Sequence, residues 1–290
     1  MRKFLIALVI LLMMGTAALI MASTPLGEAI WPQEQARPAF STTLNTESER
    51  IETTTLEYAG LLTVNNQLGR IVIEGDDVAE IALRVVKRAK ASFGSGTALL
   101  DQIKVETAVT GGRTQISARV PRTQDGDQVS VDLYLKVPKE IVANIKVNLG
   151  EVEIKDVNGT LRIDNDLGSI SIRDFVGNAF IQADLGAVNI YHAQFEDNLQ
   201  ISSSMGDVVV AGSLARSSII ESRLGAVQIF IPPNEAYDLE ANIDLGDFVI
   251  AAPFTGERSQ NSVVGTIGTG ETAGSVELSI SLGSLKIDYL

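Results

Sequence analysis

Three aspartates, Asp164, Asp166 and Asp184, are the residues of this sequence best placed to bind a cation. Asp164 and Asp166 are two positions apart, so in a β-strand both point to the same face. Asp184 follows Asp166 by 18 residues, at the same place in the next copy of a repeated phrase. Like charges on adjacent strands, about 5 Å apart, are unfavourable unless a cation or hydrogen bonds intervene. The pattern therefore predicts either a weak divalent-cation site or carboxylates that cap backbone N–H groups at a corner.

Other residue types that could do chemistry are isolated. His192 is the only histidine, and its position predicts a surface residue at the end of a turn. Ser202, Ser203 and Ser204 lack the strand–turn–helix context of an activated serine. The absence of cysteine excludes thiol catalysis, disulfides and zinc–thiolate sites. We therefore predict no catalytic residue, no resident metal and no cofactor.

An enzyme that cleaves polysaccharides is the alternative in the catalytic class. Its acidic cleft would contain Asp166 and Asp184, and Arg162 or Arg223 could assist. Such a site usually carries exposed aromatic rings for sugar stacking. Aromatic residues make up only 5% of this chain, and strand parity predicts that Phe180 and most others point inward.

The charge balance disfavours nucleic acid as a partner. The formal net charge is −13, from 23 basic and 36 acidic residues, and no sustained basic patch occurs. The short basic run at Lys87–Lys90 could touch anionic headgroups or polymer, but it is also typical of a solvated strand edge. Asn158-Gly159-Thr160 matches a glycosylation sequon, and we interpret it as a turn between strands.

The candidate residues belong to a phrase that returns along the chain. It reads NLGEVEI, DLGSISI, DLGAVNI, SMGDVVV, RLGAVQI and DLGDFVI, with 18 to 21 residues between successive glycines from Gly150 to Gly246. Further copies surround Gly69 and Gly283, and the gap of 37 residues before Gly283 predicts one degraded copy. Self-similarity at this period is the signature of a stacked repeat.

Apolar residues alternate with polar ones around each glycine. The residues two and four after it are almost all Val or Ile, and the residue five before it is usually Val or Ile. The residue directly before it is Leu in seven copies and Met205 in the eighth, and we count this column among the apolar ones. The column three before it holds small polar residues such as Asn165 and Ser203, which would need hydrogen bonds along an interior stack. Period-two alternation predicts strands.

A repeat of this length leaves no room for a crossover helix. The sequence therefore predicts an all-β fold, a right-handed parallel β-helix (β-solenoid) with 18–21 residues per turn, preceded by one N-terminal hydrophobic helix. The handedness follows the general rule for parallel crossovers. The glycine supplies the bend of each turn.

The β-solenoid domain is expected over residues 56–290. Residues 78–139 would form longer flanking strands, partly antiparallel, with a hairpin turn at Gly111-Gly112. Regular turns would occupy residues 144–250, a glycine-rich loop residues 252–274 and a closing turn residues 275–290.

The N-terminal residues predict export. Arg2 and Lys3 precede 19 uncharged residues, so residues 1–22 are a signal sequence or an uncleaved membrane anchor. The poor cleavage pattern favours the anchor, with Arg2 and Lys3 in the cytoplasm. Residues 23–55, rich in proline and polar residues, are expected to be a linker.

The order of these features is similar to that of a known family. A first G-x-V-x-I turn, long strands, an LKVP stretch entering regular turns and a final LSISLGSLKI resemble the putative-adhesin, or toast-rack, β-strand-repeat domains of prokaryotic envelope proteins. The resemblance covers roughly residues 55–290, although this chain has Leu-Gly at corners where relatives often have Ser/Asn-Gly-Asp. It implies a non-enzymatic envelope module, sometimes associated with membrane-stress signalling.

Together these features predict an extracytoplasmic scaffold or adhesin-like binding module, held at the cell envelope by its N-terminal segment. Its partner would be an envelope polymer or protein, with self-association as a further possibility. The alternatives are an element that assembles end to end or signals envelope stress, and the polysaccharide-active enzyme.

Overall fold

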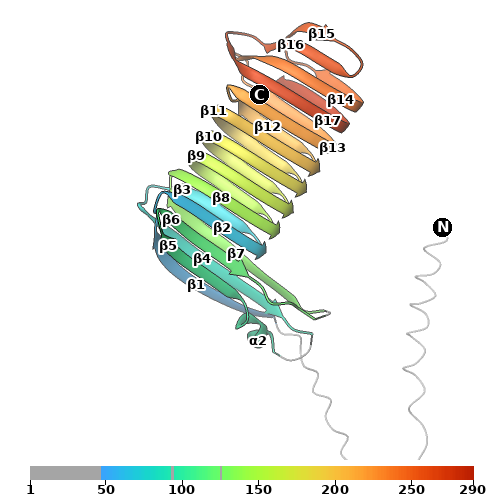
Figure 1. Cartoon of the computed structure of the whole chain (residues 1–290). Helices are drawn as coiled ribbons and strands as arrows, with labels where there is room; N and C mark the ends of the chain where they lie inside the picture. The colour runs from blue at the N-terminus through green and yellow to red at the C-terminus, as the bar shows by residue number, and fades with distance from the viewer. Residues whose placement is uncertain (1–46, 93–94, 125) are drawn as a thin grey trace, which may run out of the picture. The chain divides into compact units, whose positions relative to one another are not determined.

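The computed structural model describes residues 47–92, 95–124 and 126–290. They form an all-β fold, as expected, in which 17 strands join in one open sheet (Figure 1). The strands are β1 Glu47–Glu57, β2 Leu61–Leu68, β3 Ile71–Asp76, β4 Glu80–Lys90, β5 Lys104–Thr110, β6 Arg113–Arg119, β7 Gln128–Pro138, β8 Glu140–Leu149, β9 Val152–Leu167, β10 Ile170–Leu185, β11 Val188–Met205, β12 Val208–Ser213, β13 Ser217–Ile231, β14 Ala236–Ile250, β15 Phe254–Arg258, β16 Ser262–Gly268 and β17 Thr272–Tyr289.

The one described helix is α2, Gly96–Leu100. None of the helices in the described part of the chain combines the length and apolar character that crossing a membrane requires. The hydrophobic helix expected over residues 1–22 lies outside the described residues.

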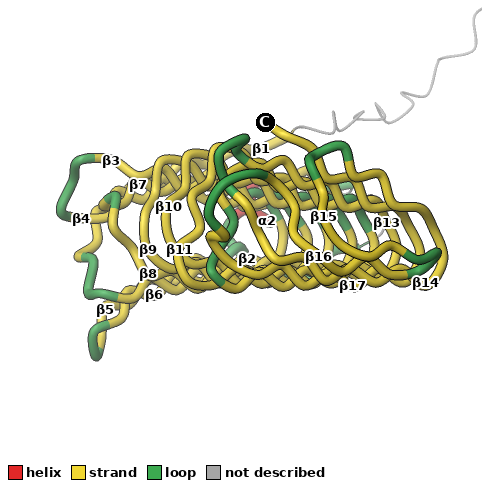
Figure 2. The backbone as a smooth tube through the Cα atoms, turned by 90° about the horizontal axis from the view of Figure 1, so that it is seen from above, coloured by secondary structure: helices red, strands yellow, loops and turns green. Residues whose placement is uncertain are grey.

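Successive repeats stack in parallel and in register. Ile170 of β10 pairs with Val152 of β9 on one side and with Val188 of β11 on the other. The turns accordingly overlap when the stack is viewed from above (Figure 2). At the corners the glycines lie directly over one another: a Cβ on Gly168, whose φ is +135°, would meet the carbonyl oxygen of Gly150 at 1.9 Å. Only glycine permits this backbone and this approach.

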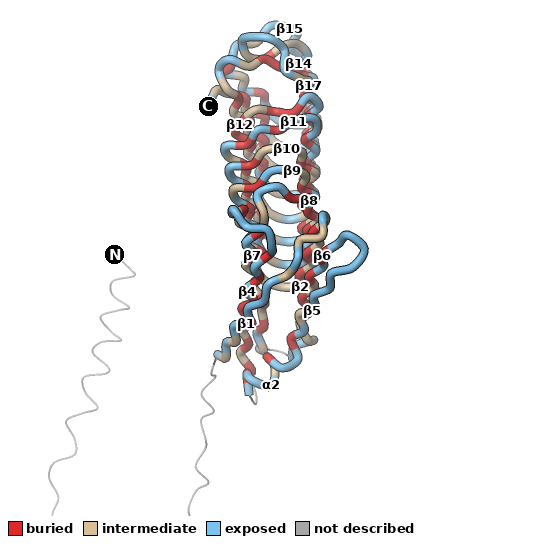
Figure 3. Tube along the Cα trace, turned by 90° about the vertical axis from the view of Figure 1, so that its left-hand side faces the viewer, coloured by how far each residue is buried: buried red, intermediate tan, exposed pale blue. Residues whose placement is uncertain are grey.

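The interior is a continuous column of branched aliphatic side chains. Ile154, Ile172 and Ile190 are fully buried, as are their equivalents in the other turns except Ile250, which is half-buried (Figure 3). The prediction for the column directly before the glycine was wrong, because most of these side chains are exposed, including Leu167 at 44% and Met205 at 48%. The chain turns at the glycine, so the period-two alternation does not extend across the corner.

The N-terminal end of the stack contains the expected longer strands. β4 pairs antiparallel with β1 and with β7, and β5 and β6 form the hairpin with Gly111 and Gly112 at its turn, both at positive φ. Residues 47–55, assigned to the linker from their polar composition, instead belong to β1. β1 is mostly exposed and is held by its backbone ladder to β4, so its sequence carries little apolar alternation.

The C-terminal end does not follow sequence order. β17 pairs in parallel with β13 and with β14, so the closing strand lies between two earlier ones (Figure 1). The gap before Gly283 therefore does not hold a degraded copy of the repeat. The segment expected to be a glycine-rich loop instead contains β15 and β16, an antiparallel pair that extends the sheet beyond β14.

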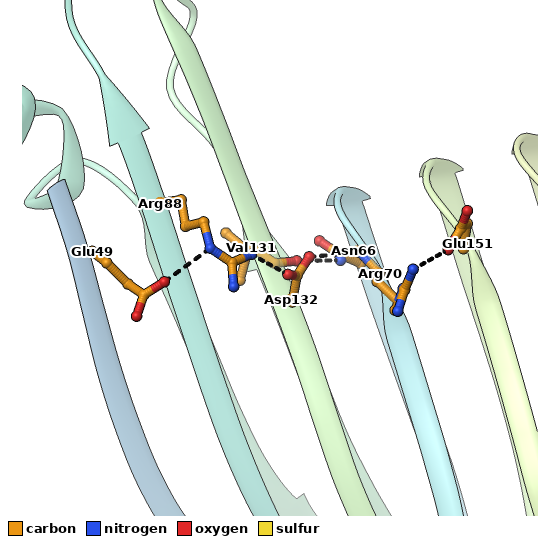
Figure 4. A network of polar contacts seen from close by, with 7 residues as sticks. All are labelled: Glu49, Asn66, Arg70, Arg88, Val131, Asp132 and Glu151. Atoms are coloured by element: carbon orange, nitrogen blue, oxygen red, sulfur yellow. Dashed lines mark hydrogen bonds and ion pairs between the residues drawn. The ribbon is translucent and has the colours of Figure 1, made fainter. Parts of the chain in front are cut away.

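A polar network joins the flanking strands to the first corner (Figure 4). Arg88 of β4 binds Glu49 at 2.9 Å and also pairs with Asp132 of β7. Asp132 accepts the backbone N–H of Arg70 at 2.9 Å, and the Arg70 guanidinium pairs with Glu151 in the next turn at 2.5 Å. Lys87, 8% exposed, is paired with Glu52 at 2.7 Å. Lys87 and Arg88 are therefore neutralised between strands, so they are not part of a solvated edge or a free basic patch.

Candidate functional site

The acidic column contains an internal cation. Lys146, one turn before Asp164, donates to the Asp164 carboxylate at 2.7 Å. This hydrogen bond raises the pKa of Lys146 above its usual value, and the charges of Asp164, Asp166 and Asp184 act in the same direction. The three aspartates are half-buried on the outer surface of β9 and β10. Repulsion among the three carboxylates is therefore reduced by the Lys146 ammonium. The sequence alone did not indicate this contact.

Two other roles were expected for these carboxylates, the capping of corner N–H groups and the binding of a cation. The corner N–H groups of Gly168 and Gly186 already donate to the carbonyls of Leu185 and Met205, at 2.8 and 2.9 Å, so they need no aspartate cap. Over the described ranges, no three His, Asp or Glu side chains gather in an arrangement that could hold a metal ion. A cation at Asp164, Asp166 and Asp184 would therefore have to compete with Lys146.

The interior polar column bonds to the corner backbone. Asn165 donates to the carbonyls of Gly150 and Gly168 at 3.2 and 3.0 Å, and Asn66 donates to Val131 at 2.8 Å. The hydroxyls of Ser203 and Ser222 are buried and have no hydrogen-bond partner among the described residues. The expected ladder of side-chain hydrogen bonds is thus replaced by single asparagines that bind the corner carbonyls. Ser203 has a structural position rather than access to a substrate.

His192 lies at an outer corner, as its sequence position indicates. Its side chain is 78% exposed, and Nδ1 is 3.4 Å from the Asp174 carboxylate. His192, Asp156 and Asp174 occupy equivalent positions in successive turns and share a positive φ of 53° to 57°. Asp is among the residues that tolerate this left-handed conformation, and His is also enriched there. The residue types at this corner are therefore explained by backbone geometry.

A polar groove lies beside the acidic column. Its volume is about 210 Å³, and it is lined by Arg162, Ile163, Asp164, Phe180, Ile181, Gln182, Gln200 and Ser202. The Arg162 guanidinium lies 4.9 Å from the centre of the Phe180 ring. Phe180 is half-buried and borders this groove, so the expectation that it points inward was wrong. The strand register places Arg162, Phe180 and Gln200 side by side, because Phe180 pairs with Arg162 on β9 and with Gln200 on β11.

The arrangement in this groove suits a polar, uncharged ligand. Amides, a hydroxyl and a carboxylate provide hydrogen-bond donors and acceptors beside an aromatic ring. The positive charge of Arg162 and the negative charge of Asp164 lie in the same groove, so neither sign dominates. The signal that could have revealed it is the alternation within RIDND, FIQAD and QISSS, which places the first, third and fifth side chains of each stretch on the outer face; the first two of these line the groove.

A second hollow lies on the sheet of flanking strands. It has a volume of about 460 Å³, and its lining includes Thr53, Thr55, Ala82, Arg84, Tyr134 and Lys136. The small side chain of Ala82 pairs across the sheet with the long side chain of Lys136, and this difference in size makes the hollow. Arg84 lies 5.7 Å from the centre of the Tyr134 ring. This surface could not be predicted from the sequence, because part of it comes from β1, whose residues 47–55 read as a polar linker.

Comparison of the whole chain with known proteins gives matches among solved structures. No protein-family model matches, and no curated protein matches. A putative adhesin from Parabacteroides merdae has a TM-score of 0.43 at 8% identity, over 82% of this chain and 95% of that one. A putative cell adhesion protein from Clostridium sporogenes has a TM-score of 0.37 at 13% identity, over 84% of this chain and 100% of that one.

The structural neighbours of this chain include putative adhesins. The resemblance expected from the repeats is confirmed to that extent. Another neighbour is a putative lipid binding protein from Parabacteroides distasonis, with a TM-score of 0.38 at 12% identity, over 83% of this chain and 96% of that one. At these scores and identities the likeness assigns no ligand and no site to this chain.

Proposed function

We propose that the chain is an exported, membrane-tethered, right-handed parallel β-solenoid that acts without catalysis as an adhesin-like binding module of the cell envelope. The polar groove at Phe180 would bind a neutral segment of an envelope polysaccharide. Residues 1–22 would anchor the module to the membrane.

The groove beside Phe180 carries this proposal. A sugar ring offers C–H groups on its faces and hydroxyls on its rim, which match an aromatic side chain surrounded by amide and carboxylate groups. Gln182 of β10 is paired with Ser202 of β11, and Phe180 of β10 with Gln200 of β11, so each pair is separated by about the strand spacing of 4.8 Å. A linear polymer lying across the strands could contact several of them at once. The stacked backbone fixes these positions before the ligand binds, which lowers the entropic cost of binding.

The proposal is tested by co-sedimentation of the full-length chain, held in detergent micelles, with envelope polysaccharides and peptidoglycan. Bound chain and released sugar are measured in the same samples, with and without calcium. Phe180→Ala should weaken binding about 2- to 12-fold, the range that corresponds to an aromatic contact of about 0.5–1.5 kcal/mol. Tyr191→Ala is the matched control, because Tyr191 lies under Arg173 at 5.7 Å but does not line the groove.

Different results separate the remaining functions. Equal weakening by Phe180→Ala and Tyr191→Ala would place binding outside the groove. Release of sugar that is lost in Asp166→Ala or Asp184→Ala would instead establish the polysaccharide-active enzyme. Binding without release, reduced by Phe180→Ala alone, is the expected result.

A further inference from the structure

An exposed apolar ridge runs along the corner of the stack. It consists of the residue directly before each repeated glycine, in stacking order Leu68, Leu149, Leu167, Leu185, Met205, Leu224, Leu282 and Leu245. Leu68 is half-buried, and the other seven side chains are 43% to 67% exposed. At about 4.8 Å per turn, eight residues extend over about 34 Å. Single exposed leucines need no explanation, but an aligned series marks an interaction surface.

The charges beside the leucine ridge argue against an anionic membrane as its partner. Two columns flank it, one residue before each leucine and one residue after each glycine. They contain Asp166, Asp184, Asp244, Glu151, Asp207 and Asp247, against only Arg70 and Arg223. Anionic headgroups attract basic segments and would be repelled by this border. A protein surface that is apolar at its centre and complementary in charge at its edges fits this ridge better.

We infer that the leucine ridge pairs with the ridge of a second copy of this chain, in antiparallel orientation. The two-fold axis would pass between Leu185 and Met205, the middle of the eight-residue series. Leu167 would then face Leu224 of the second copy, and each end of one ridge would face the opposite end of the other. All eight residues are paired in this arrangement.

The flanking charges fit this arrangement. With the axis perpendicular to the ridge, each flanking column faces its own copy in reverse order. Asp166 then faces Arg223, which makes no ion pair within the described residues, and this contact occurs twice. At the ends of the ridge, Arg70 faces Asp247. The remaining charged residues face neutral ones, such as Asp184 opposite Ser204 and Glu151 opposite Ser284.

Other arrangements place like charges together. A parallel pair would bring Asp244 of each copy against Asp247 of the other. If the antiparallel pair is shifted by one turn in one direction, Asp184 of one copy faces Asp184 of the other. The opposite shift brings Asp207 against Asp207 of the second copy, and Glu151 against its Asp247. Opposed like charges suppress a wrong arrangement. The unshifted antiparallel pair is free of such contacts in both columns.

A strip about 34 Å long reaches the roughly 800 Å² per partner of a standard interface when it is about 24 Å wide, so a stable pair must bury the two flanking columns and the residues beside them as well as the ridge. End-to-end assembly is less favourable, because the sheet beyond β14 ends in β15, a short edge strand carrying Glu257 and Arg258. Self-association would therefore be lateral.

Cysteine cross-linking tests this inference in the full-length chain, because the natural sequence contains no cysteine. The chain is reconstituted in lipid nanodiscs at one copy per disc, which leaves the ridge free of detergent. Two differently tagged variants, Leu167→Cys and Leu224→Cys, are oxidised alone and as a mixture. Antiparallel pairing predicts a cross-link between the two variants in the mixture and little within either variant alone.

Exchange of the charges at Asp166 and Arg223 gives a second test on the same discs. Its readout is the dissociation constant of the pair, measured by mass photometry. Arg223→Asp should raise this constant at least tenfold, because four carboxylates then meet at two sites, and adding Asp166→Arg should restore it. Arg173→Asp, remote from the ridge, is the control. Cross-links within each single variant would overturn the orientation. Monomers at all concentrations, or binding of discs by the ridge to lipid instead of protein, would overturn the inference.

Discussion

Gly283 stacks directly on Gly225, although β14 and its hairpin lie between them in the chain. Gly283 also pairs with Gly246, so the last strand separates two strands that are consecutive in the regular series. The backbone groups on both edges of β17 are thus hydrogen-bonded to neighbouring strands. The end of the chain is an internal part of the stack.

Deletion of residues 272–290 should therefore unfold more than one terminal strand. We expect the backbone amides of β14, β15 and β16 to lose their protection from hydrogen exchange, because β14 pairs with the rest of the stack through β17. The amides of β9, β10 and β11 should stay protected, because these strands keep their neighbours. Hydrogen–deuterium exchange of the full-length and shortened chains measures this. Protection retained in β14 would show that it can re-pair with β13, which carries the same repeat.

A single methyl group at a corner should be destabilising. Gly168→Ala combines a φ of +135° with a Cβ only 1.9 Å from a backbone oxygen, so we expect a loss of about 2–5 kcal/mol in the free energy of unfolding. Gly111→Ala is the control, since its φ is +58° and its Cβ would have nothing within 4 Å. Chemical denaturation of both variants gives the comparison. Similar losses at the two positions would contradict the close stacking of the corners.

Some parts of this fold follow from the sequence for clear physical reasons. The buried columns at Ile154 and Ile172 alternate with polar residues, and residues 80–85 alternate between exposed and buried positions, so both predict strands at the observed positions. The stacking order could not be predicted. Every turn presents the same apolar pattern, so the sequence of β17 is as compatible with β13 as with any other turn. The position of β17 between β13 and β14 depends on the hairpin of β15 and β16, whose glycine-rich sequence resembles that of a loop.

The candidate site was predicted in part for the same kind of reason. Alternation placed Asp164 and Asp166 on the outer face, where they are found. Lys146 precedes them by a whole turn, and only the register of β8 with β9 brings it to Asp164. The exposure of Leu167 depends on the bend at Gly168, where strand parity no longer applies.

Lys146 should determine whether the acidic column takes up calcium. In the unchanged chain we expect millimolar calcium to leave the Tm unaltered, because the ammonium already compensates Asp164. Lys146→Met should lower stability by no more than about 1 kcal/mol at low salt, since the pair is partly exposed, and calcium should then restore it. Lys286→Met, which removes an ion pair with Asp288 and a contact with the Phe230 ring away from the acidic column, is the control. A calcium-dependent rise of the Tm in the unchanged chain would establish a native cation site.

Tyr237 should make the stability of the C-terminal turns sensitive to alkaline pH. Its ring is fully buried, its hydroxyl binds Glu235, and it accepts the N–H of Leu214 at 2.9 Å. Burial raises its pKa well above the ordinary value of 10, and the neighbouring Glu235 acts in the same direction. The folded chain therefore keeps this proton to a higher pH than the unfolded chain. Its contribution to stability is complete below pH 10 and falls as the pH rises above it.

Tyr237→Phe separates this effect from general alkaline unfolding. The variant should lose about 1–3 kcal/mol at pH 7, because the Leu214 N–H and the Glu235 carboxylate lose a buried partner. Above pH 10 the difference from the unchanged chain should shrink, since the variant has no phenol to ionise. Urea denaturation at pH 7, 9, 10 and 11 measures both quantities, with the half-buried Tyr289→Phe as the control. A constant difference across this range would mean that Tyr237 ionises no later in the folded chain than in the unfolded one.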